Sequence, residues 1–66
     1  MTLNPLRLYR RRRRMKREAL EEAQYLRRRY GPEAVRVARD QLERPDLTTW
    51  GHQVLEEAIR ILKRGI

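Results

Sequence analysis

The chain has no cysteine and no serine, and it contains one histidine, His52. Without cysteine it can form neither a disulfide nor a thiolate metal site, so nothing points to an oxidising compartment. Candidates for catalytic acids, bases and nucleophiles are few. His52 fits a surface histidine, and Thr48 and Thr49 fit helix caps better than nucleophiles. We therefore expect a protein that is not an enzyme and that uses no cofactor or metal.

Long apolar runs are also missing. No stretch approaches the ~20 apolar residues that a membrane-spanning helix requires. A secretory signal peptide would place its apolar segment after the first basic residues, whereas Glu18, Glu21 and Glu22 follow them here. We expect a cytoplasmic protein of bacterial type. Residues 1–17 are rich in arginine and free of acids, as organellar transit peptides are, so a targeting segment stays an alternative.

Acidic residues are absent from the first 17 positions, which carry eight of the 17 basic residues. The other nine basic residues and all nine acids come after position 17. Nine minus nine is zero, so residues 18–66 are neutral and the net charge of +8 belongs to residues 1–17. A charge block beside a balanced remainder is typical of an interaction tail. We call residues 1–17 the basic arm and residues 18–66 the body; the basic residues of the arm are Arg7, Arg10, Arg11, Arg12, Arg13, Arg14, Lys16 and Arg17.

A long helix is predicted over residues 5–30. Asn4 and Pro5 suit a helix start, and no helix breaker follows before Gly31. At helical spacing one narrow stripe is almost entirely apolar, and it comprises Leu8, Met15, Ala19, Ala23, Leu26 and Tyr30. Two four-residue ion pairs are predicted at the junction of arm and body, Arg14 with Glu18 and Arg17 with Glu21.

Two shorter helices are predicted over residues 33–44 and 47–64. Gly31 and Pro32 indicate a chain reversal, Pro45 ends the second helix, and Asp46 or Thr48 can cap the third. Glu56 and Arg60, four residues apart, are predicted to form an exposed ion pair. The predicted core consists of Ala19, Ala23, Leu26, Tyr30, Val35, Ala38, Leu42, Trp50, Val54, Ala58 and Ile61, with Trp50 as its largest buried side chain.

The fold that buries these faces together is a small all-α, three-helix arrangement. The second and third helices form a hairpin against residues 15–30 of the first, and the basic N-terminal half of the first helix projects. At 66 residues the chain has room for one small domain of marginal stability, so a partner or a second copy of the chain, as a homo-oligomer, is also predicted.

One residue pattern resembles that of small bacterial α-helical proteins. It has the form A-x-x-L-x-x-x-[His/Tyr]-G-x-x-A, and the residues that carry it are Ala23, Leu26, Tyr30, Gly31, Ala34 and Ala38, followed by Trp50, Val54 and Ile61. The likeness covers about residues 19–62. It implies an all-α fold and carries no activity, ligand or catalytic residue, and the basic arm lies outside it.

The arm has an anionic partner in each functional interpretation. Nucleic acid comes first, because guanidinium groups match phosphate oxygens and five consecutive arginines surround a helix on all sides. Tyr9, next to Arg10, could stack on a base. In the second interpretation Leu3, Leu6 and Leu8 form an apolar wedge before the basic run and anchor the chain to an anionic membrane. In the third the chain is an accessory subunit or adapter of a larger protein complex.

Overall fold

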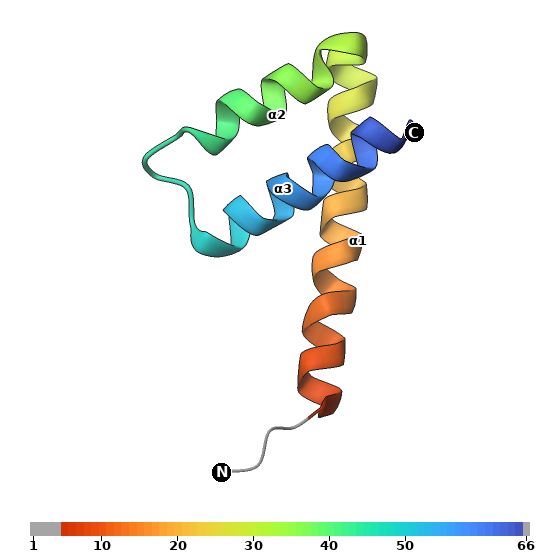
Figure 1. Ribbon diagram of the computed structural model, residues 1–66, viewed down its shortest axis with the longest axis vertical. Coiled ribbons are helices and arrows are strands. Elements are labelled where there is room, and N and C mark those ends of the chain that lie inside the picture. The colour runs from red at the N-terminus through yellow and green to blue at the C-terminus, as the bar shows by residue number, and fades with distance from the viewer. Residues whose placement is uncertain (1–4, 66) are drawn as a thin grey trace.

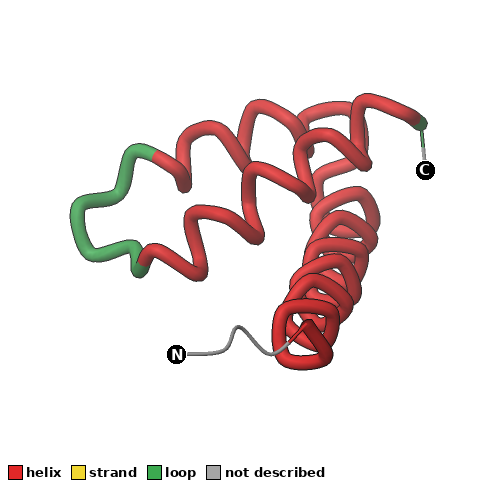
Figure 2. Tube along the Cα trace, turned by 60° about the horizontal axis from the view of Figure 1, so that its bottom comes forward, coloured by secondary structure: helices red, strands yellow, loops and turns green. Residues whose placement is uncertain are grey.

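The computed structural model describes residues 5–65, with side chains from Arg10 onward. Within that part the protein is all-α, as predicted. Its elements are α1 (Pro5–Tyr30), a short 3-10 helix η1 (Gly31–Glu33), α2 (Ala34–Leu42) and α3 (Thr49–Arg64). In Figures 1 and 2, α2 and α3 lie side by side as a hairpin against the second half of α1. The first half of α1 extends beyond them, which confirms the predicted arrangement (Figure 1).

The first helix has the predicted bounds and runs for 26 residues. Pro5 suits its first position, because the fixed φ of proline is already helical and an N–H there has no partner within the helix. The helix ends where Gly31 takes a φ of +55°, a left-handed conformation that residues with a Cβ rarely adopt. The 3-10 turn that follows takes up Gly31–Glu33, so α2 begins at Ala34, one residue later than predicted.

The connection between α2 and α3 is longer than predicted. Helix α2 ends at Leu42, because Pro45 disfavours helical geometry at the residue before it and the chain turns over Asp40 to Arg44. Helix α3 begins at Thr49, because Thr48 is extended and its Oγ1 accepts a hydrogen bond from the Gly51 N–H at 2.9 Å. Thr48 is therefore the cap. Asp46, the other candidate, accepts a hydrogen bond from Arg44 Nη2 at 3.3 Å instead.

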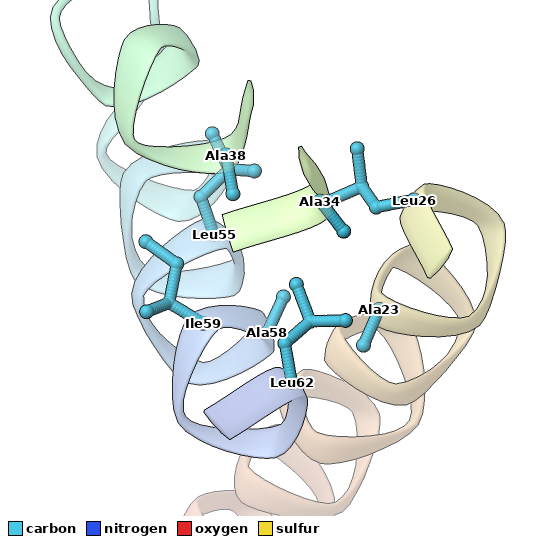
Figure 3. Close-up of a cluster of buried hydrophobic side chains, with 8 residues drawn as sticks. All are labelled: Ala23, Leu26, Ala34, Ala38, Leu55, Ala58, Ile59 and Leu62. Carbon is cyan, nitrogen blue, oxygen red and sulfur yellow. The ribbon is translucent and has the colours of Figure 1, made fainter. Parts of the chain in front are cut away.

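The core lies where the three helices meet. Ten apolar side chains are buried, and eight of them form one cluster, drawn in Figure 3. Helix α3 contributes half of the ten because α1 and α2 cover it from two sides. The ten are Ala19, Ala23, Leu26, Ala34, Ala38, Val54, Leu55, Ala58, Ile59 and Leu62.

The predicted core was partly wrong. Five of its members are only half-buried: Tyr30, Val35, Leu42, Trp50 and Ile61. Four buried residues were missed: Ala34, Leu55, Ile59 and Leu62. The reason is geometric. The side of α3 that turns toward the other two helices runs through Leu55, Ile59 and Leu62, and Trp50 stands at the N-terminal edge of that surface. Leu26 and Leu62, not Trp50, are the largest fully buried side chains.

Small residues allow α1 to approach the hairpin closely. Ala19 and Ala23, one turn apart on α1, are fully buried, as are Ala34, Ala38 and Ala58 on the other two helices. The distance between packed helices depends on the side chains at the contact, so alanines bring the helix backbones near. Leu26 and Leu62 then fill the remaining space between the helices (Figure 3). This half of α1 is therefore fixed to the hairpin.

Arg27 ties the C-terminal ends of two helices together. Its Nη1 donates to the carbonyl oxygen of Gly31 at 2.9 Å, just beyond α1, and its Nη2 donates to that of Leu62 at 3.1 Å, in the last turn of α3. Its Nε is buried and has no partner among the described residues. Carbonyl groups at a helix end carry partial negative charge and lack partners within the helix, so one cation here serves both helices.

We expect Leu26→Ala to lower the free energy of unfolding by about 2–5 kcal/mol, because it removes a fully buried side chain and leaves a cavity. Urea denaturation followed by circular dichroism measures the change. Leu20→Ala is the control, since Leu20 lies on the same helix with 40% of its surface exposed and should change stability far less. Equal midpoints for the two variants would contradict the position of the core.

We expect Arg27→Met to lower the free energy of unfolding by roughly 1–3 kcal/mol, because two charge-assisted hydrogen bonds are lost and two carbonyl groups lose their partner. Arg28→Met removes the same charge from the neighbouring exposed position and is the control, with an expected change within about 0.5 kcal/mol. A variant at Arg27 that unfolds at the same urea concentration as the one at Arg28 would show that the tie contributes nothing.

Candidate nucleic-acid interface

The basic residues of the arm lie on α1. The seven with described side chains are all exposed: Arg10, Arg11, Arg12, Arg13, Arg14, Lys16 and Arg17. Arg7 also belongs to α1, although its side chain lies outside the described ones. Successive residues of a helix are turned by about 100°, so Arg10 to Arg14 cover the whole circumference of the helix. The arm thus presents positive charge in every direction.

The apolar and aromatic candidates of the arm fall outside the described side chains. Leu6, Leu8 and Tyr9 belong to α1 by their backbone, and Leu3 lies outside the described residues altogether. The stacking role of Tyr9 and the membrane wedge of the three leucines therefore stay predictions. The described part of the chain contains no helix both long and apolar enough to cross a membrane.

The predicted ion pairs between arm and body do not form. Within residues 10–65 no carboxylate lies within 4.0 Å of a charged nitrogen of the arm, so neither Arg14 with Glu18 nor Arg17 with Glu21 is paired. The three pairs of an arginine with a carboxylate in this part of the chain all lie in the body. One of them joins Arg60 to Glu57 at 2.7 Å, so the predicted pairing of Arg60 with Glu56 was wrong. The cations of the arm are thus not neutralised by these acids.

Trp50 connects the body to the arm. Its indole Nε1 donates a hydrogen bond to Glu18 Oε2, and the guanidinium carbon of Arg11 lies over its ring, 5.6 Å from the centroid. Arg11 and Glu18 are seven residues apart, which places them on the same side of α1. A cation at this distance over an indole ring is attracted by the negative face of the ring. Sequence reasoning placed Trp50 in the core, but the ring is half-buried at the edge between body and arm.

A second basic group lies at the opposite end of α1. The contact of Arg27 with Leu62 brings the ends of α1 and α3 together, and four exposed cations directly follow these two residues in the sequence. We call them the far-end cluster: Arg28, Arg29, Lys63 and Arg64. Sequence reasoning missed this cluster because it treated the body as one neutral unit. Basic residues in the last turn also stabilise a helix end through the helix dipole.

The charges of the body are separated in space. Residues 27–36 and 60–65, at the end of the molecule where α1 and α3 finish, hold seven basic residues and one acid, a sum of +6. Residues 18–26 and 37–59 hold two basic residues and eight acids, a sum of −6. The body is therefore neutral as a whole but has one basic and one acidic part, and the acidic residues of α1, Glu18, Glu21 and Glu22, lie between the arm and Arg27 along that helix.

The residues considered for catalysis have structural contacts. His52 is exposed, and its Nδ1 lies 2.7 Å from Glu56 Oε1, one turn further along α3. Thr48 caps α3. Among the described residues no three histidines or acids are grouped in a way that could hold a metal ion.

Comparison with protein-family models, with curated proteins and with solved structures finds no significant match to this chain. The resemblance to small bacterial α-helical proteins stays a prediction.

We expect Glu18 and Trp50 to be energetically coupled. In a double-mutant cycle of Glu18→Ala and Trp50→Phe, the coupling free energy should be about 1 kcal/mol, because phenylalanine keeps an aromatic ring and loses the N–H that Glu18 accepts. Thermal and urea unfolding of the four proteins give the value. The same cycle with the exposed Glu21 in place of Glu18 should give no coupling, and equal couplings in both cycles would contradict the contact.

Proposed function

We propose that this chain binds nucleic acid, RNA or DNA, by contacting its phosphates with the basic arm. The observation that supports this most directly is the exposure of Arg10 to Arg14 around one helix without an acidic partner among residues 10–65. Guanidinium groups present forked pairs of N–H donors that fit phosphate oxygens, and they stay charged at any physiological pH.

The cylindrical distribution of the charges favours a particular kind of site. A flat surface would engage only one side of the arm, whereas a groove or a cleft lined by phosphates can engage several sides at once. The deep, narrow major groove of an RNA helix and the interior of a ribonucleoprotein both have this shape. RNA is therefore the nucleic acid that we favour.

Repulsion within the arm supports a partner as well. Like charges at four-residue spacing destabilise a helix by a few tenths of a kcal/mol per pair, and the arm contains Arg10 with Arg14 and Arg13 with Arg17 at that spacing. Phosphates between these side chains would remove the repulsion. Binding therefore stabilises the helical form of the arm, and contacts made to phosphates alone give little preference for base sequence.

The test compares two full-length variants with the same change of charge. In the arm variant, Arg10, Arg12, Arg13 and Arg14 are replaced by glutamine, and Arg11 keeps its contact with Trp50. In the control variant, the four members of the far-end cluster, Arg28, Arg29, Lys63 and Arg64, are replaced by glutamine. Both variants lose four positive charges, so a difference between them reports position and not net charge.

We expect the binding constant of the unaltered protein to fall as salt concentration rises. On duplex DNA a log-log plot should have a slope of at most about −7 if all eight cations engage, and a somewhat smaller one on single strands. The arm variant should reduce that slope by about 3–4, whereas the control variant should leave it nearly unchanged. Fluorescence anisotropy with labelled RNA and DNA over a salt series provides the measurement.

Two results would overturn the proposal. One is an equal loss of binding in the two variants, which would attribute the interaction to net charge alone. The other is that the unaltered protein binds vesicles containing anionic lipid but neither RNA nor DNA, which would favour the membrane interpretation instead.

A further inference from the structure

Arg11 differs from the other cations of the arm. Of the seven with described side chains, it is the one whose guanidinium lies over an aromatic ring, that of Trp50, at 5.6 Å from the centroid. The ring is itself held in place, because its Nε1 donates to Glu18 and its backbone belongs to the first turn of α3, which Thr48 caps. The attraction between guanidinium and ring favours this position of the Arg11 side chain before any ligand arrives.

We infer that Arg11 and Trp50 together form a stacking site for one unpaired nucleobase. This inference rests on the proposed function. A guanidinium group is planar and weakly hydrated, and it stacks on aromatic rings and on bases alike. Arg11 is exposed, so a ligand can approach its side chain from solvent. The base would pack on the guanidinium of Arg11, next to the indole ring of Trp50.

The neighbouring residues would hold the phosphates that flank this base. Arg10 and Arg12 stand directly beside Arg11 along the chain, and Arg14 follows one turn later, so charged groups surround the site on the arm side. Glu18 lies about 10 Å further along α1, at 1.5 Å per residue, and its negative charge disfavours phosphates there. The strand is therefore expected to run along the arm and to place a base at the edge of the body.

This arrangement selects a class of ligand. In a duplex every base is paired and stacked between its neighbours, so a duplex can offer the arm only its phosphates. A single strand, a loop or a bulge offers bases that can leave the stack, and stacking of a base on an aromatic or guanidinium plane tolerates any base sequence. The preferred ligand is thus single-stranded nucleic acid, or a structured RNA with an unpaired nucleotide.

Two substitutions that preserve the charge test the stacking site. Arg11→Lys removes the planar guanidinium over Trp50, and Arg13→Lys makes the same chemical change at an exposed position of the same helix. The ligands are a short RNA of mixed sequence as a single strand, the duplex that it forms with its complement, and a strand of equal length without bases. Binding is measured at a single salt concentration and at a temperature below the melting transition of each protein.

We expect Arg11→Lys to weaken binding of the single strand about tenfold, within the range measured for loss of one stacked base, and Arg13→Lys to weaken it no more than about twofold. The two variants should bind the duplex and the strand without bases equally well. Trp50 is the only tryptophan, so its fluorescence reports on the site directly: the single strand should change it in the unaltered protein and much less in Arg11→Lys.

The outcomes separate this inference from the proposed function. Equal affinities of Arg11→Lys and Arg13→Lys for the single strand would overturn the stacking site and leave phosphate binding by the arm in place. Equal losses on the strand with bases and the strand without them would also overturn it. If the unaltered protein binds none of the three ligands, the proposed function fails and the inference fails with it.

Discussion

The other two helices cover an apolar face on the second half of α1, and the arginines of the first half limit how far that cover can extend. Ala19, Ala23 and Leu26 are fully buried there, whereas the residues from Arg10 to Arg14 are exposed on all sides. The hairpin of α2 and α3 packs where burial of apolar surface is favourable and cannot extend over a ring of guanidinium groups, whose burial without partners would be very costly. A projecting arm is the necessary result.

Arginine does three different things in this chain, and its surroundings decide which. Arg27 is partly buried and joins the carbonyl ends of two helices, so it contributes to stability. Arg11 lies over the ring of Trp50, whose negative face attracts its charge. Arg13 and its neighbours are exposed and lack a carboxylate partner within residues 10–65, so they suit an external anion. Net charge alone does not distinguish these three cases.

Folding also separates the positive and negative charges of the body in space, which its net charge of zero does not show. The contact between Arg27 and Leu62 joins the ends of α1 and α3, and the acids Glu18, Glu21 and Glu22 lie on α1 between that contact and the arm. A polyanion approaching the molecule therefore meets a repulsive region beside the arm. The proposed interaction is confined to the arm and its edge with Trp50, because the adjoining surface of the body repels phosphates.

The sequence by itself determined the all-α class, the bounds of α1, the cap at Thr48 as one of two candidates, and the position of the charged arm. These features depend on neighbouring residues: Pro5 and Gly31 set the ends of a helix, and a run of arginines cannot be buried whatever the fold. The tertiary structure decided the rest. Which part of α3 is buried depends on the directions from which α1 and α2 approach it. As a result Leu55 and Ile59 belong to the core, and Trp50 lies at its edge. The contact of Arg11 with Trp50 and that of Arg27 with Leu62 join residues 39 and 35 positions apart, and local periodicity carries no information on such pairs because the packing of helices alone brings them together.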